Sequence, residues 1–193
     1  MTHQSSTLHF PLGDGILPWT TKKGVSVRIR HIRSDDADLL VELYGRLSAR
    51  TLELRFATMM INVPMSSILK YASRLATLNP ENADALIALV DEDGEDRIVA
   101  VARLAGATKT TAEFAMLVRD DFQGHGLGTH MFDLLIQLAL VRGLDTLTAS
   151  VVAENIGMMT LIRRCGFPFT VHTSYGESDV VIYLGDVPEG VRV

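Results

Sequence analysis

The chain has 193 residues, an apolar fraction of 47% and a formal net charge of −5. Its length and apolar content suit one globular domain with a sizeable core. No block of basic residues occurs, which argues against nucleic acid as a partner. No long apolar run or signal-peptide core occurs either, which argues against a membrane association. The single cysteine, Cys165, excludes an internal disulfide and favours a cytoplasmic location.

The first half of the chain predicts an extension followed by a strand, helices and a hairpin. Residues 1–24 mix glycines and prolines with apolar residues, and they predict an irregular N-terminal extension that lies on the domain; a disordered arm is an equal alternative. Asp93-Gly94 is a strong hairpin signal between two apolar segments. In chain order, the predicted elements are a strand over 25–32, helices from Ser34, from Thr51 and over about 64–78, and strands over 85–91 and 97–104.

The second half alternates strands and helices around a glycine-rich turn. Apolar periodicity predicts, in order, a strand over 111–118, a helix over 126–142, a strand over 145–152, a helix over 155–165 and a last hairpin that includes Val171 and 180–184. Cys165 falls on the apolar face of its helix, so we interpret it as a core residue rather than a nucleophile. Residues 186–193 form the predicted C-terminal tail.

The turn between the strand over 111–118 and the next helix predicts a phosphate site. Three glycines, Gly124, Gly126 and Gly128, allow a close approach to the backbone at the start of a helix. The P-loop requires Gly-Lys-Ser or Gly-Lys-Thr, whereas this turn continues as Gly128-Thr129-His130, and the dinucleotide fingerprint requires a different glycine spacing. The pattern Gln-x-x-Gly-x-Gly that begins at Gln123 resembles the pyrophosphate loop of the GNAT superfamily of acyl-CoA N-acyltransferases.

A second motif supports this resemblance. Residues 155–167 are similar to the GNAT signature Asn-x-x-(apolar)-x-x-Leu-x-x-x-x-Gly-Phe, with Asn155 at its start and Gly166-Phe167 at its end. Asn155 suits a helix N-cap and Gly166 suits a helix C-terminal turn. Both motifs occur in the family's order, separated by a helix and a strand.

The resemblance implies a GNAT fold of the α/β (α+β) class. A mixed, mostly antiparallel central sheet is flanked by helices, and the strands over 111–118 and 145–152 splay apart to form the acyl-CoA cleft. The GNAT domain is expected to cover residues 25–185.

The resemblance also implies acetyl-CoA as cosubstrate, with no metal. The expected cofactor contacts are the strand edge and the loop, namely Met116, Leu117, Val118, Gln123, Gly124, His125, Gly126, Leu127, Gly128 and Thr129, together with Asn155 near the reacting end. His125 occupies a position where relatives often have Arg or Lys, and we expect it to act mainly through its backbone. For Asn155, helix capping alone remains an equal alternative.

The reaction needs a base, because a lysine amine has an ordinary pKa of about 10.4. Glu113 is the predicted catalytic base, since a charged residue in an apolar strand is costly unless it is paired or functional; the alternative is an edge-strand glutamate in solvent. Many GNAT enzymes use a tyrosine as general acid, and Ile162 fills that position here. Tyr175 and Tyr183 are possible substitutes that nothing in the sequence places at the site.

Two segments indicate the subfamily. Leu47–Phe56 resembles the Leu-Ser-x-x-(Ser/Thr)-x-x-x-Arg-Phe segment of Pat-type bacterial protein lysine acetyltransferases, and Ala112–Gly124 resembles their Ala-Glu-Phe-Ala-x-x-Val-x-Asp-x-x-Gln-Gly segment. The resemblance implies direct acetyl transfer to a protein lysine, such as one on an acyl-CoA synthetase. Transfer to a small-molecule amine and a non-catalytic CoA-binding sensor stay open, and the chain is expected to be a monomer or a homodimer.

Overall fold

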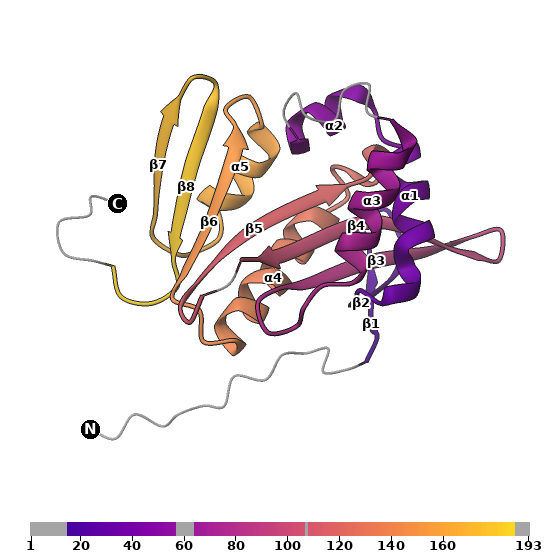
Figure 1. Ribbon diagram of the computed structural model, residues 1–193, viewed down its shortest axis with the longest axis horizontal. Helices are drawn as coiled ribbons and strands as arrows, with labels where there is room; N and C mark the ends of the chain where they lie inside the picture. The colour runs from indigo at the N-terminus through magenta and orange to yellow at the C-terminus, as the bar shows by residue number, and fades with distance from the viewer. Residues whose placement is uncertain (1–14, 57–63, 107, 188–193) are drawn as a thin grey trace.

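The computed structural model describes residues 15–56, 64–106 and 108–187, which build an eight-stranded sheet with helices on both faces (Figure 1). The strand order is β1-β2-β3-β4-β5-β6-β8-β7. All neighbouring strands are antiparallel except β5 and β6, which are parallel. The strands are β1 Leu17–Thr20, β2 Ser26–His31, β3 Asp84–Glu92, β4 Glu95–Ala105, β5 Thr111–Val118, β6 Thr146–Val152, β7 Phe169–Ser174 and β8 Glu177–Tyr183.

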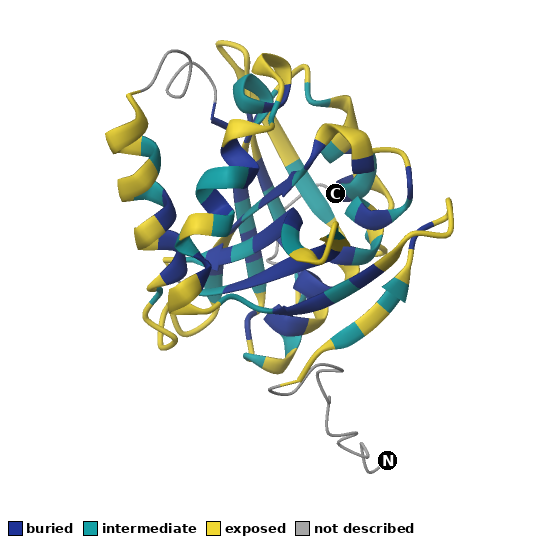
Figure 2. Cartoon of the chain, turned by 90° about the vertical axis from the view of Figure 1, so that its right-hand side faces the viewer, coloured by how far each residue is buried: buried dark blue, intermediate teal, exposed yellow. Residues whose placement is uncertain are grey.

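The helices divide the core into two layers, one on each face of the sheet. Alternate residues of β3 point to opposite faces, so Leu86 and Ile87 belong to different clusters. One cluster includes α4 (Leu127–Val141) and α5 (Ile156–Arg163); the other includes α1 (Ala37–Gly45), α2 (Ala49–Phe56) and α3 (Met65–Ala76). Buried residues accordingly follow the strands, and exposed residues cover the outer sides of the helices (Figure 2).

The predicted elements agree with the structure to within a few residues. β5 covers the predicted 111–118, and the helix predicted over 126–142 is α4. The β3–β4 turn has positive φ at both Asp93 (57°) and Gly94 (82°), the conformation expected of an Asp-Gly hairpin. No helix in the described part of the chain is long and apolar enough to span a membrane.

The prediction of an irregular segment over 1–24 is wrong for its last part. Residues 17–20 form β1, which pairs antiparallel with β2 from Leu17↔Ile29 to Thr20↔Ser26. The strand was hard to recognise because it is short and contains Pro18, a residue that edge strands tolerate. Residues 1–14 and 188–193 lie outside the described residues, so the boundaries of the extension, domain and tail stay predictions.

The sheet opens between β5 and β6, as the GNAT resemblance implies. Their pairing covers three residue pairs, the last being Glu113↔Thr148. Beyond that point β4 continues to pair with β5 as far as Val118, and β8 continues to pair with β6 as far as Val152. Each strand is therefore held from its other side, and the two diverge without losing their own sheet partners.

Candidate active site

A cleft of about 440 Å³ lies beside β5, past the point where β5 and β6 separate. This volume lies in the range of small-molecule and cofactor sites. Residues from six regions line it: the β1–β2 turn, α2, β5, the glycine loop, the start of α4 and α5. They are Lys22, Thr51, Leu54, Arg55, Met116, Leu117, Val118, Gln123, Gly124, Gly126, Gly128, Thr129, Asn155, Gly157, Met158 and Leu161.

The glycine loop presents a helix N-terminus to the cleft. Gly126 is the N-cap of α4 with φ of 86°, and Gly124 has φ of 73°, so both need the left-handed region that glycine adopts without strain. No side chain caps α4 at this end. The first N–H groups of a helix have no partner within it, and the helix dipole adds partial positive charge there. This geometry fits a phosphate group of a bound nucleotide cofactor.

The open edge of β5 forms one wall of the cleft. β4 pairs with β5 through Met116 and Val118, which leaves the opposite edge of these residues facing the cleft. The Gln123 side-chain amide donates to the Val118 carbonyl at 3.0 Å and to the Thr51 hydroxyl at 3.2 Å. The end of this edge is therefore already engaged by the chain, and an extended ligand has the preceding residues to pair with.

Two of the predicted loop residues turn their side chains away from the cleft. His125 and Leu127 are buried and absent from the lining, so their contact with the cofactor stays a prediction. Asn155 is the N-cap of α5, because its side-chain oxygen accepts the Met158 N–H at 3.0 Å. It also lines the cleft, and its contact with the cofactor stays a prediction. The remaining predicted contacts all line the cleft.

Lys22 is a lining residue that the sequence analysis did not select. Its N–H donates to the His125 carbonyl at 3.0 Å, which fastens the β1–β2 turn to the glycine loop. Its side chain passes over Gly126, where an added Cβ would lie 3.1 Å from Lys22 Cε. The only signal for it in the sequence was a lysine pair in a segment predicted to be irregular.

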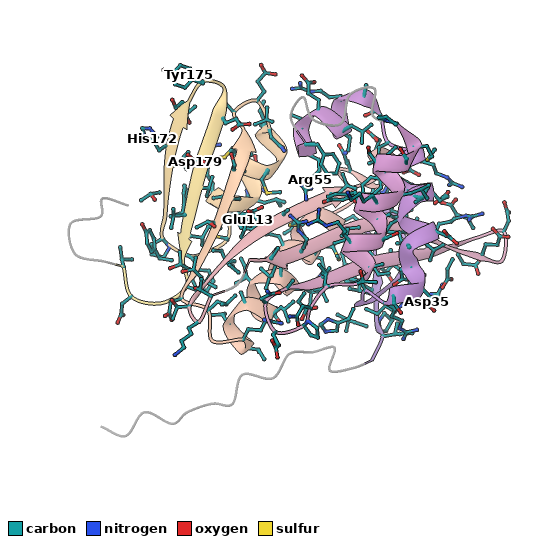
Figure 3. The ribbon with its side chains drawn as sticks, viewed as in Figure 1. Asp35, Arg55, Glu113, His172, Tyr175 and Asp179 are labelled. Atoms are coloured by element: carbon teal, nitrogen blue, oxygen red, sulfur yellow. The ribbon has the colours of Figure 1, made fainter. Side chains whose placement is uncertain are left out.

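Glu113 lies where β5 and β6 begin to separate. It lines a smaller cavity of about 50 Å³ next to the cleft, and the two cavities share Leu54, Arg55, Met116, Asn155 and Met158. Its side chain is 60% exposed, and one carboxylate oxygen lies 3.7 Å from Nη2 of Arg103. Figure 3 shows Glu113 on β5 and Arg55 on α2; both residues line the smaller cavity.

The tyrosines considered as general acids lie elsewhere. Tyr175 is fully exposed at the β7–β8 turn (Figure 3), and Tyr183 is buried at the end of β8 opposite Thr146. Ile162, which fills the usual tyrosine position, is buried in α5. Cys165 packs against the core, and its thiol lies 3.7 Å from the Phe167 carbonyl oxygen. Neither these tyrosines nor the cysteine lines the cleft.

Asp120 joins the two segments that resemble Pat-type enzymes. Its carboxylate accepts hydrogen bonds from the Ser48 hydroxyl at 2.6 Å, the Ser48 N–H at 3.0 Å and the Thr51 hydroxyl at 2.7 Å. Burial opposes the charged form of Asp120, but these hydrogen bonds outweigh it and hold the pKa of Asp120 below its usual value. The start of α2 is thus fixed to the loop after β5, which places α2 over the cleft.

Comparisons with known proteins agree with this geometry. Residues 26–168 match the family model described as an acetyltransferase (GNAT) domain. Acetyltransferase PA5475 of Pseudomonas aeruginosa is 30% identical over 75% of this chain and 76% of its own length. Acetyltransferase Pat of Mycolicibacterium smegmatis is 26% identical over 78% of this chain, which spans 44% of that relative.

A solved structure shares the fold. The GNAT domain of S. lividans PAT has a TM-score of 0.71 and 22% sequence identity, and the match covers 88% of this chain and 97% of that one. The present chain has the same sheet architecture, its strands β5 and β6 splay apart, and its residues 26–168 match the family model. The chain therefore belongs to the GNAT acetyltransferase domain family.

Proposed function

We propose that the protein transfers an acetyl group from acetyl-CoA to a primary amine, a lysine side chain of another protein. One observation carries the proposal: the cleft has a helix N-terminus suited to phosphate at one end of β5, and the adjoining smaller cavity has a carboxylate, Glu113, toward the other end. The five residue steps from Glu113 to Val118 span about 17 Å of extended strand. A cofactor with a phosphate end and a distant reactive end matches that separation.

Each part of the cleft has a role in the proposed reaction. The N–H groups of residues 124–129 hold the pyrophosphate, and the open edge of β5 pairs with the amide-bearing arm of the cofactor, as an added strand does. Met158 and Leu161 from α5 supply the opposite, apolar wall. The cosubstrate supplies a thioester carbonyl at the Glu113 end.

Glu113 acts as general base in a ternary complex. The acceptor nitrogen forms a bond to the thioester carbon, the carbon–sulfur bond breaks with the electron pair leaving on sulfur, and the nitrogen's proton passes to the Glu113 carboxylate. A thiol with an ordinary pKa near 8.5 is a fair leaving group without a general acid. Direct attack is supported because Cys165 lies outside the cleft lining.

The acceptor side is formed by α2, in the segment that resembles Pat-type enzymes. Thr51, Leu54 and Arg55 line the cleft, whereas Phe56 is buried beside the rings of Tyr44 and Tyr71. The resemblance of this segment and of the β5 segment supports a protein lysine, such as one on an acyl-CoA synthetase. The rival functions are acetylation of a small amine and CoA binding without turnover.

The test is a thiol-release assay with acetyl-CoA and a panel of small amines, peptides and acyl-CoA synthetases. Mass spectrometry then locates acetyl-lysine on each protein substrate. The proposal expects lysine modification of at least one protein. A free amine used with kcat/KM above about 10⁴ M⁻¹s⁻¹, with no protein modified, supports the small-amine function instead. CoA binding without any transfer supports the non-catalytic function.

A further inference from the structure

Arg55 differs from the other described arginines in its surroundings. It is partly buried on the last turn of α2 and lines both the cleft and the smaller cavity. No described carboxylate forms an ion pair with it; its contacts are the Phe56 ring, 4.8 Å from the guanidinium carbon, and the Tyr71 hydroxyl at 3.4 Å. A partly buried charge is costly without a counter-charge.

The remaining described arginines are either paired or solvated. Those with a carboxylate within ion-pair distance are Arg28, Arg30, Arg46, Arg50, Arg97, Arg103, Arg119 and Arg142. Those without one are exposed, namely Arg33, Arg74, Arg163 and Arg164. In the described part of the chain, Arg55 alone combines partial burial with the lack of an acidic partner.

The charged groups near Arg55 are a second arginine and one glutamate. The Arg103 guanidinium approaches the same Tyr71 hydroxyl at 3.4 Å, and its Nε is buried with no hydrogen-bond partner in the described structure. Glu113, 3.7 Å from Arg103, is the one acidic residue in the lining of the two cavities. Glu113 already has Arg103, which lines neither cavity, as its partner, so Arg55 is left without a counter-charge among the described residues and is complementary to a further anion.

We propose that Arg55 binds a carboxylate of the acceptor while the acceptor's amine lies at Glu113. The inference rests on the proposed function and specifies its substrate class: an amine with a carboxylate close to it. Arginine suits this task because its planar guanidinium binds a carboxylate through two parallel hydrogen bonds. The carboxylate belongs either to the acceptor molecule itself or to an acidic residue beside the acceptor lysine.

The contact geometry allows both groups to be bound together. Arg55 and Glu113 line the same cavity of about 50 Å³, which has room for only a few heavy atoms between them. They are also the two ends of one short series of contacts, through the Tyr71 hydroxyl and Arg103. The inference therefore requires an acceptor whose amine and carboxylate both reach this cavity.

Matched acceptors that differ only in charge test the inference. One pair is a blocked peptide with Glu or Gln before the acceptor lysine, and the other is β-alanine and β-alaninamide, compared at equal concentrations of free amine. We expect the wild type to favour the carboxylate member of at least one pair by about tenfold or more in kcat/KM. The peptide pair and the small-amine pair distinguish the two sources of the carboxylate.

Variants assign the preference to Arg55. Arg55→Gln should reduce the preference for the carboxylate acceptor to within about twofold, and Arg55→Lys should keep part of that preference. Arg74→Gln, on the exposed side of α3, should keep the whole preference. Calorimetry should show the same CoA affinity for Arg55→Gln as for the wild type, because the carboxylate site lies on the acceptor side.

Two outcomes overturn the inference and leave the proposed function standing. In the first, the wild type acetylates the neutral and the anionic members of both pairs equally well. In the second, Arg55→Gln loses CoA affinity but keeps the charge preference, which would assign Arg55 to the cofactor. Failure to acetylate any amine would instead refute the proposed function, and this inference with it.

Discussion

Glu113 is the residue on which the proposed chemistry depends most directly. Glu113→Gln keeps the shape of the side chain and removes its basicity, so kcat should fall by roughly 10²–10⁴ while CoA affinity changes little. The loss should shrink at high pH, because free amine is then already present. Thiol-release assays of the wild type and Glu113→Gln over a range of pH measure this loss of kcat. Glu95→Gln, at the exposed β3–β4 turn, is the control, and wild-type turnover by Glu113→Gln at pH 7 would assign the base elsewhere.

Gly126 is predicted to be essential for CoA binding because of both its conformation and its position. Gly126→Ala places a Cβ in the cleft at φ of 86°, beside the Lys22 side chain, and should weaken CoA binding by about tenfold or more. Gly143→Ala has a similar φ of 71° but no atom within 4 Å of its Cβ, at the other end of α4. Calorimetry should show weaker binding for the first variant only; equal affinities would mean that phosphate does not contact the loop here.

At the scale of elements, the β1–β2 turn gives the glycine loop a positive side chain. Lys22 is fastened to the loop by its N–H bond to His125 and lines the cleft, whereas Lys23, equally exposed, is absent from the cleft lining. Lys22→Ala should weaken CoA binding by about tenfold, and Lys23→Ala should not, although both remove one charge. The loss should diminish as salt is raised. Equal effects of the two substitutions would indicate a general charge effect rather than a contact.

The position of α2 depends on Asp120, and this dependence has a predicted pH profile. The pKa of Asp120 is lower in the native state than in the unfolded chain, so its carboxylate stabilises the fold fully above the unfolded value of about 3.9. That stabilisation is lost as pH falls through the lower native pKa. Asp120→Asn should therefore reduce the free energy of unfolding by about 1 kcal/mol at pH 7 and by progressively less in acid.

Urea unfolding of both proteins from pH 7 to pH 3 measures this difference. Asp179→Asn, exposed on β8 away from α2, serves as the matched control (Figure 3). A stability difference between wild type and Asp120→Asn that stays constant down to pH 3 would contradict the assignment of these hydrogen bonds to the ionised carboxylate.

For the whole molecule, the cleft is the place where the sheet has fewest connections. Strands β1–β5 and strands β6–β8 are joined by the three residue pairs of β5 and β6. A cofactor that contacts β5, the glycine loop and α5 bridges the two parts. At free CoA of about 100 times Kd, the free energy of unfolding should rise by about 2.7 kcal/mol, with a Tm increase of about 5–10 °C.

Thermal scans with and without CoA test this expectation, and amide exchange locates the effect. Exchange should slow in α5 as well as in the glycine loop, since both line the cleft. An unchanged Tm at saturating CoA would show that the cleft does not hold the cofactor in the folded protein. Slower exchange in the loop alone would restrict the contact to the phosphate end.

The sequence by itself determined the elements and the position of the glycine loop between β5 and α4. Period-two and helical patterns, the Asp93-Gly94 turn and the Gln-x-x-Gly-x-Gly spacing act over a few neighbouring residues, so they are visible without the fold. The position of Glu113 on β5 also follows from the local strand pattern. Strand β1 was not predicted, because a short edge strand that contains Pro18 shows too little alternation of apolar and polar residues. Its formation depends on pairing with β2, which the local sequence does not reveal.

Only the tertiary structure decided which residues complete the site. Lys22 reaches Gly126 across 104 positions of sequence, and Asp120 holds Ser48 across 72, so no local pattern relates them. The same holds for Arg55 and Phe56, adjacent residues of which one lines the cleft and the other is buried among tyrosines. A helix turns successive side chains by about 100°, and which of them meets the cleft depends on where the helix is docked.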